Sequence, residues 1–133
     1  MDVRLIEIPK FEDHTGNVAV VESGIVPFDI KRIFYLYDIE GSATRGRHAH
    51  KELIQFLIPI SGSFDVIVKN GINEEVFTLN DPAKGLLLNA GLWNELVNFS
   101  PGAVCMVVAS DVYDEADYIR DFDDYLIYVK ASK

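Results

Sequence analysis

The sequence predicts an all-β protein: a double-sheet β-sandwich or barrel that forms one domain over residues 1–133 and carries a short helical segment near its C-terminus. Runs of apolar, β-branched and aromatic residues recur about every eight to twelve residues, and turn-forming residues separate them. Hydrophobic residues make up 49% of the chain and charged residues 25%, a balance typical of a globular domain that buries one core.

The expected strands follow one another through most of the chain. A turn-like segment at residues 12–17 precedes the first of them, and Asn70-Gly71 is a strong signal for a tight hairpin. Asn80-Asp81-Pro82 interrupts the pattern, because proline cannot donate to a sheet. The expected strands are residues 18–21, 30–39, 53–60, 64–68, 75–79, 85–88, 95–99 and 103–110, with a further strand through the histidine pair described below.

The tail, from about residue 114 to residue 128, is the one segment that predicts a helix. Ala116, Ile119, Phe122 and Leu126 recur there at roughly helical spacing. Acidic residues concentrate in the same region, and we expect most of them to form a solvated face.

Composition and charge exclude several classes of protein. The net charge is -9, from 12 basic and 21 acidic residues, which disfavours a nucleic-acid partner because such binding needs a basic face. No apolar run approaches the roughly 18 residues of a membrane span. The N-terminus lacks a secretory pattern, so we expect a cytoplasmic protein with no membrane partner. Cys105 lies in an apolar run, where a cysteine is usually a small buried hydrophobe.

The stretch Arg45-Gly46-Arg47-His48-Ala49-His50 holds two of the three histidines. On a strand, residues i and i+2 point to the same face, so both imidazoles would project into one space while Ala49 faces the other way. The pair could be two histidines on a half-wet strand, a metal site or an acid–base site. The flanking arginines, the glycine and the buried strand that follows favour a functional site.

The spacing around these histidines resembles the cupin pattern, which implies a jelly-roll fold. In one cupin motif, His-x-His is followed by Glu and then by Gly; here Gln55 and Gly62 stand at those spacings after His48 and His50. In the second motif a histidine stands where this sequence has Asn94. Neutral amides are poor ligands for transition metals, so we expect no metal and no cofactor. The histidines would then be free to carry protons.

A narrower resemblance spans nearly the whole chain. Its most specific parts are Arg45-Gly46-Arg47-His48-Ala49-His50-Lys51 and the tail Ser110-Asp111-Val112-Tyr113-Asp114-Glu115-Ala116-Asp117-Tyr118-Ile119-Arg120; residues 31–38, 61–63, 93–95 and 98–100 match as well. With these motifs the chain resembles the nucleotide-sugar 3,4-ketoisomerases, which act on dTDP-4-keto-6-deoxyglucose. The resemblance implies a metal-independent cupin homodimer whose two histidines move a proton between C3 and C4 through an enediolate. The product would be a dTDP-3-keto-6-deoxyhexose, on the way to a 3-amino-3,6-dideoxysugar for a cell-surface glycan such as lipopolysaccharide or an S-layer glycan.

The same resemblance and the residue chemistry suggest a set of site residues. We expect His48 to be the base at the sugar and His50 its partner or proton relay, although the order could be reversed. We expect Tyr37 to donate its phenol to a sugar oxygen and Arg45 to stabilise the enediolate or hold the diphosphate. The predicted substrate-binding side chains are Tyr35 (an alternative to Tyr37 in the site), Arg47, Gln55, Trp93, Asn94 and Arg120 (for which a salt bridge with nearby acids is the alternative).

Three other functions stay open on the sequence. A 3,5-epimerase of the same substrate would share the fold, but it requires a carboxylate-supported histidine, and no such partner is evident near His48 or His50. A metal-binding cupin such as a dioxygenase and a non-catalytic nucleotide-sugar-binding cupin are the others. The sequence also leaves open whether the product is galacto- or gluco-configured at C4.

Overall fold

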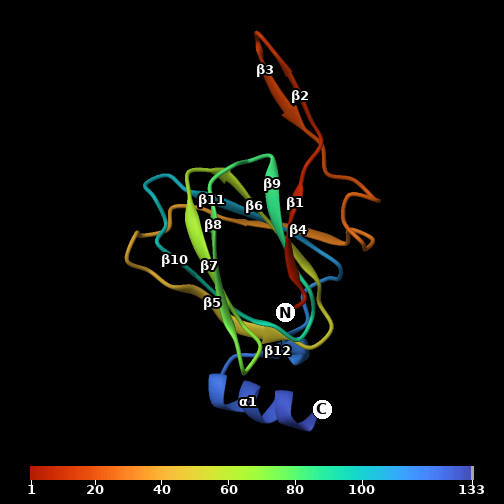
Figure 1. Cartoon of the computed structure of the whole chain (residues 1–133), viewed down its shortest axis with the longest axis vertical. Helices are drawn as coiled ribbons and strands as arrows, with labels where there is room; N and C mark the ends of the chain where they lie inside the picture. The colour runs from red at the N-terminus through yellow and green to blue at the C-terminus, as the bar shows by residue number, and fades with distance from the viewer. Residues whose placement is uncertain (133) are drawn as a thin grey trace.

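Two five-stranded antiparallel sheets face each other and enclose the core in the computed structural model, which describes residues 1–132 (Figure 1). The first sheet has the order β1 (Val3–Glu7), β9 (Lys84–Leu88), β6 (Gln55–Ser61), β11 (Val104–Ala109) and β4 (Arg32–Leu36). The second has the order β12 (Tyr118–Ile119), β5 (Arg45–His50), β10 (Trp93–Val97), β7 (Phe64–Lys69) and β8 (Glu74–Leu79). The predicted double-sheet jelly roll is confirmed. The predicted strands overlap β3 to β11, whereas β1, β2 and β12 were not expected.

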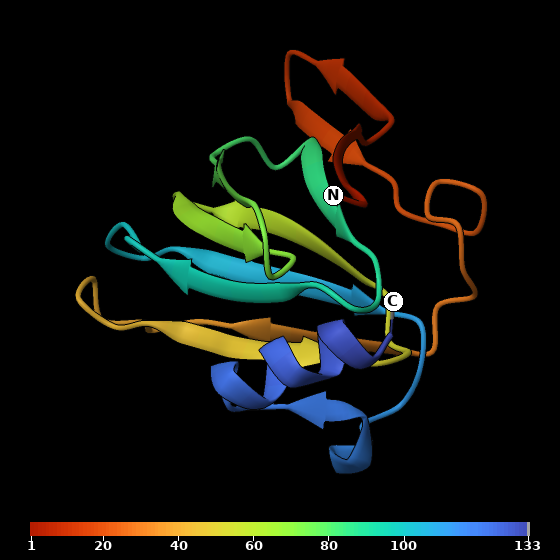
Figure 2. The same cartoon turned by 60° about the horizontal axis from the view of Figure 1, so that its bottom comes forward.

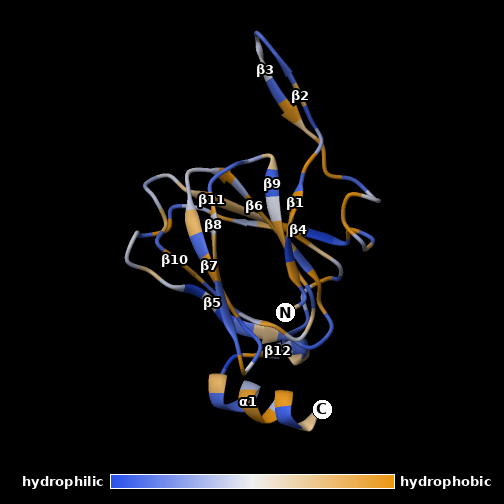
Figure 3. Cartoon of the chain, viewed as in Figure 1, coloured by the Kyte–Doolittle hydropathy of each residue, from blue (hydrophilic) through white to orange (hydrophobic). Residues whose placement is uncertain are grey.

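The core lies between the two sheets and follows from the period of two along each strand. In β7, for example, Phe64, Val66 and Val68 are buried in the core, and the residues between them are half-buried. Figure 3 shows hydrophobic segments along the strands of both sheets. A second buried cluster covers the outer face of the first sheet, where Val26 and the half-buried Phe28 pack with Phe56 of β6.

The tail differs from the predicted helix over residues 114–128. A short 3-10 helix, η1 (Glu115–Asp117), leads into β12, and only after it does the helix α1 (Phe122–Ala131) begin. Asp121 caps α1, because its side chain accepts a hydrogen bond from the backbone N–H of Asp124. The predicted α-helix is therefore reduced to a short 3-10 helix in its first part and is replaced by a strand at residues 118–119, because the edge of β5 provides backbone hydrogen bonds that β12 uses instead.

Helix α1 packs on the outer face of the second sheet, beside β5 and β12 (Figure 2). Tyr125 is fully buried there with Ala49, Trp93 and Ile119. The Tyr125 hydroxyl donates to the Gly91 carbonyl at 2.7 Å, so its polar end is satisfied. This packing fixes β5 from outside and leaves its other face to the barrel interior.

Strands β2 (Lys10–Asp13) and β3 (Gly16–Ala19) form a separate hairpin that projects away from the barrel (Figure 1). All eight of its residues are exposed, including Phe11 at 67% and Val18 at 60%. A lone two-stranded hairpin is marginally stable in water, so the contacts between β2 and β3 alone are too few to keep this hairpin folded.

No helix within residues 1–132 is both long enough and apolar enough to cross a membrane.

Candidate active site

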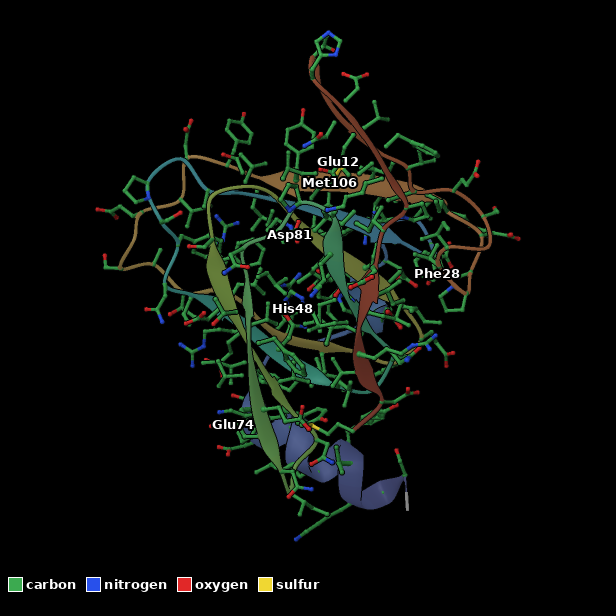
Figure 4. All side chains as sticks on the ribbon, turned by 45° about the horizontal axis from the view of Figure 1, so that its top comes forward. Glu12, Phe28, His48, Glu74, Asp81 and Met106 are labelled. Atoms are coloured by element: carbon green, nitrogen blue, oxygen red, sulfur yellow. The ribbon has the colours of Figure 1, made fainter. Side chains whose placement is uncertain are left out.

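A β-bulge sets the position of His48 on the inner face of β5, inside the barrel (Figure 4). Gly46 and Arg47 both have positive φ, at 79° and 56°, opposite the register shift in β10. A Cβ on Gly46 would lie 2.9 Å from Asn94 Oδ1, so a glycine suits both the conformation and the close approach. The bulge brings the Gly46 carbonyl oxygen within 3.1 Å of His48 Nδ1. Because a carbonyl can only accept, Nδ1 carries the hydrogen, and Nε2 of the neutral ring holds the lone pair.

His50 is oriented by a carboxylate from the tail. Its Nδ1 lies 3.2 Å from Asp117 Oδ2. Asp117 is itself held by the backbone N–H groups of Glu52, at 2.8 Å, and Leu53, at 3.2 Å. Within residues 1–132, His50 Nε2 is buried and has no hydrogen-bond partner. Both imidazoles therefore keep Nε2 free as a proton acceptor, and the expectation that neither histidine has a carboxylate partner was wrong.

Tyr118 packs against both histidines. Its ring centroid lies 4.2 Å from that of His50 and 5.1 Å from that of His48, and the two imidazole centroids are 4.8 Å apart. The Arg120 guanidinium lies 4.1 Å from the Tyr118 ring centroid, on the side of the solvent. Arg120 forms a bidentate salt bridge with Glu115, with both N···O distances 2.8 Å. The alternative given for Arg120, a salt bridge with a nearby acid, is therefore the one observed. Two N–H groups of Arg120 donate to the Glu115 carboxylate.

Burial lowers the pKa of both imidazoles. The pKa of His48 falls from 6.5 to about 4, first because burial disfavours the charged ring and then because His50 and Arg120 add positive charge nearby. Burial also lowers the pKa of His50, and Asp117 opposes that shift. Both rings are thus neutral near pH 7, and His50 is the one whose protonated form a neighbouring carboxylate stabilises.

Because these pKa values are depressed on folding, we expect the histidines to make stability depend on pH. The stabilisation is complete above pH 6.5, the pKa of an unfolded histidine, and is lost as the pH falls from 6.5 toward about 4. Urea unfolding at pH 7.5 and at pH 5 should therefore show a smaller loss of stability for His48→Gln than for the unchanged protein. Equal losses in the two proteins would contradict the assignment of this pH dependence to His48.

The two amides predicted to replace metal ligands lie beside His48. Gln55 and Asn94 are both buried, and they line a small interior cavity of about 40 Å³ with His48 and Gly46. Within residues 1–132, no three His, Cys, Asp or Glu side chains are placed to hold a metal ion together. Since neutral amides are weak ligands for transition metals, this donor set does not fit the metal that many cupins bind.

A larger cavity, of about 180 Å³, lies beside His50. Arg32 of β4 lines it together with Asp117 and Tyr118. Arg32 has the same strand parity as Phe34 and Leu36, which face the barrel interior. Arg32, Asp117 and Tyr118 are site residues that were not among the predicted ones.

The structure does not bring Tyr35 and Tyr37 to the histidines. Their side chains are 62% and 60% exposed on the outer face, with ring centroids 5.8 Å apart. Phe34 and Leu36 point inward, so the residues between and after them must point outward. The prediction of an active-site tyrosine on this strand was wrong for both residues.

Trp93 also faces away from the histidines. Its side chain is 1% exposed and packs under α1, with its ring centroid 5.1 Å from that of Phe122. The indole Nε1 donates to Glu95 Oε2 at 3.0 Å. The prediction of Trp93 as a substrate-binding residue was wrong, because adjacent residues of a strand face opposite sides and Asn94 faces inward.

We expect Trp93→Phe to lower stability without changing turnover. The smaller ring would lose part of its packing under α1 and the bond to Glu95, which costs about 1–2 kcal/mol in the free energy of unfolding. Urea unfolding and steady-state kinetics at one temperature would check this. A large fall in kcat with unchanged stability would instead show that Trp93 acts in the active site.

Arg45 and Arg47 lie at the surface. Both side chains are exposed, and neither lines the cavities that contain His48 or His50. The bulge turns Arg47 away from the interior, and Arg45 lies at the outer end of β5. The structure therefore does not bring these two arginines to the histidines, and Arg32 is the arginine that enters the barrel.

A closed pair of antiparallel sheets with paired histidines on its inner face is the architecture of the cupin class. A family model, FdtA: WxcM-like, C-terminal, matches residues 1–130. A TDP-4-oxo-6-deoxy-alpha-D-glucose-3,4-oxoisomerase from Aneurinibacillus thermoaerophilus is 42% identical over 130 residues, which cover 97% of this chain and 94% of that protein.

Solved structures agree. A 3,4-ketoisomerase from Helicobacter canadensis matches with a TM-score of 0.96 and 41% identity, over 98% of each chain. An asparagine-for-histidine mutant of the 3,4-ketoisomerase QdtA from Thermoanaerobacterium thermosaccharolyticum, in complex with TDP-4-keto-6-deoxyglucose, matches with a TM-score of 0.95 and 38% identity, over 98% of this chain and 95% of that chain. The chain belongs to the FdtA family of nucleotide-sugar 3,4-ketoisomerases.

Proposed function

We propose that the protein converts dTDP-4-keto-6-deoxyglucose to a dTDP-3-keto-6-deoxyhexose. The observation that carries the proposal is the pair of neutral imidazoles, His48 and His50, with both Nε2 atoms free on the inner face of a barrel of this family. A neutral imidazole is a suitable base near pH 7, and two of them side by side can pass one proton between neighbouring carbons.

The chemistry balances without an oxidant or a reductant. The C4 ketone acidifies the hydrogen on C3, and an imidazole takes that proton. The electron pair of the C3–H bond forms a C3–C4 double bond, and the carbonyl pair moves onto the C4 oxygen to give an enediolate. Proton transfer to C4 and to its oxygen, with loss of the proton from the C3 hydroxyl, leaves the ketone at C3.

His48 serves as the base at the sugar in this proposal, and His50 relays the proton. His48 holds its lone pair on Nε2 through the bond to Gly46, and burial keeps the ring neutral. His50 can hold a positive charge for longer because Asp117 stabilises it. The buried amides Gln55 and Asn94 supply hydrogen bonds to sugar oxygens beside His48. No step passes through a metal.

Product analysis tests this function. Purified protein treated with a chelator should turn the 4-keto sugar nucleotide into a 3-keto isomer of the same mass, identified by carbon NMR. A 4-keto product inverted at C5 would mean a 3,5-epimerase, an outcome that the Asp117–His50 pair makes worth testing. Binding without any product would leave only a nucleotide-sugar-binding cupin. A 3-keto product can be aminated at C3, which places the reaction before a 3-amino-3,6-dideoxysugar and the glycan that carries it.

We also propose that the protein works as a homodimer. Support comes from the projecting hairpin, where Phe11 and Val18 are exposed, and from the apolar outer face of the edge strand β4, where Ile33 is 55% exposed beside Tyr35 and Tyr37. Exposed apolar surface and an unpaired sheet edge on one molecule fit a second copy of the chain.

The double variant Phe11→Asp/Val18→Asp should shift the mass measured by light scattering from two chains to one. Ile72→Asp is the matched control, because Ile72 is 72% exposed in the turn between β7 and β8 of the second sheet, whereas the two surfaces belong to the separate hairpin and to the first sheet. An unchanged protein that runs as a monomer at micromolar concentration would contradict the dimer.

A further inference from the structure

Arg32 is a cation inside the barrel that the structure leaves without an anionic partner. It lies on the inner face of β4, and its Nε is buried with no hydrogen-bond partner within residues 1–132. No salt bridge to Arg32 occurs among these residues, although four carboxylates line the same cavity. A buried donor without a partner is costly, which indicates a group reserved for something that binds.

Two aromatic rings hold the guanidinium in place. Its central carbon lies 4.9 Å from the Phe34 ring centroid and 5.8 Å from that of Tyr113. Such cation–π contacts stabilise the charge without using its N–H donors. Arg32 and His50 line one cavity, so the free donors of Arg32 lie beside the proton-transfer groups.

We propose that Arg32 binds the oxygen on which the negative charge develops when the C3 proton is removed. This inference rests on the proposed isomerase function and identifies its oxyanion-binding residue. As the C3–H electron pair forms the C3–C4 double bond, the C4 carbonyl pair moves onto oxygen, and the Arg32 N–H groups donate to that oxygen. The charge returns to neutral when the C4 oxygen is protonated and the ketone forms at C3.

The surroundings favour a sugar oxyanion over the diphosphate of the nucleotide. Besides Arg32, the cavity is lined by the carboxylates of Glu52, Asp111, Asp114 and Asp117. They would repel a diphosphate, which carries more than one full negative charge, more strongly than a single developing charge, and one guanidinium can offset the smaller charge more completely.

The test compares Arg32→Gln and Arg32→Lys with the matched control Arg45→Gln, whose side chain is exposed outside the site. Loss of one oxyanion donor typically lowers kcat by about 100- to 1,000-fold, and we expect this for Arg32→Gln. Arg32→Lys keeps the charge but not the planar fork, so its kcat should fall by about tenfold. Exchange of the C3 hydrogen with solvent deuterium should fall in the same order, and the dissociation constant for dTDP should stay within about threefold, because dTDP lacks the reacting oxygen.

Several results would overturn the inference while leaving the isomerase function intact. A kcat of Arg32→Gln within threefold of the unchanged protein would remove Arg32 from the reaction. A tenfold or greater loss of dTDP affinity in either variant would assign Arg32 to the diphosphate. If Arg32→Gln does not fold, the test rests on Arg32→Lys alone. A kcat of Arg32→Lys equal to that of Arg45→Gln would then refute the role of Arg32 in binding the oxyanion. An unchanged protein that makes no 3-keto product would instead refute the function on which the inference rests.

Discussion

Replacing His48 by asparagine is expected to lower kcat by about 1,000-fold or more, because the base at the sugar is lost. Asparagine can keep a hydrogen bond to the Gly46 carbonyl through its amide N–H groups, but it offers no basic nitrogen to take the C3 proton. The change is small and the pocket is partly open, so binding of the nucleotide should persist. Steady-state kinetics with the 4-keto sugar nucleotide, together with calorimetric titration of dTDP, would measure both effects.

Arg45→Gln again serves as the control, because it changes a neighbouring charge on β5 outside the two cavities. It should keep kcat within about threefold, as most surface substitutions away from a site do. If His48→Asn loses dTDP affinity to the same extent as kcat, His48 holds the structure of the pocket and is not the base.

Replacing Asp117 by asparagine is expected to lower kcat by about 100-fold. Both carboxylate oxygens accept from donors: Oδ1 from the Glu52 N–H, and Oδ2 from the Leu53 N–H and from His50 Nδ1. An amide would place an NH2 group against one of these donors, so either the anchor of the loop or the orientation of His50 is lost. KM should change little, because the hydrogen bonds of this carboxylate go to His50 and to the backbone of the adjoining loop.

The pH profile separates a positioning role from a merely structural one. Asp117 raises the pKa of His50, so its loss should move the acid limb of kcat/KM to lower pH. Asp123→Asn is the matched control, since Asp123 is an exposed carboxylate in the first turn of α1. A profile that falls uniformly at every pH, with no shift of the limb, would contradict the role of Asp117 in setting the state of His50.

Much of the fold could be predicted from the sequence because turn chemistry and the period of two act locally. Glycine, asparagine and proline at the ends of apolar runs mark where strands stop, and β6, β7 and β11 lie close to where the pattern puts them. The tail could not be predicted in the same way. Within it, the two residues of β12 pair with the edge of β5, a contact across more than sixty residues of chain that no local pattern reports.

The errors in the site come mainly from strand parity. Both faces of β4 are apolar, so the sequence does not say whether Phe34 and Leu36 or Tyr35 and Tyr37 face the core. Once the tyrosines are placed outside, the same alternation puts Arg32 inside. For Trp93 a signal was available: it is adjacent to Asn94, and two neighbours on one strand cannot both face the pocket.

The most direct test of the central claim is the position of the label after reaction in deuterium oxide. If His48 and His50 pass a proton between C3 and C4, NMR of the 3-keto product should show deuterium at C4, loss of hydrogen from C3 in recovered substrate, and none at C5. His48→Asn should abolish both signals. Deuterium at C5 would contradict the account. So would a 3-keto product that His48→Asn still forms, with the same labelling at C3 and C4 as the unchanged protein.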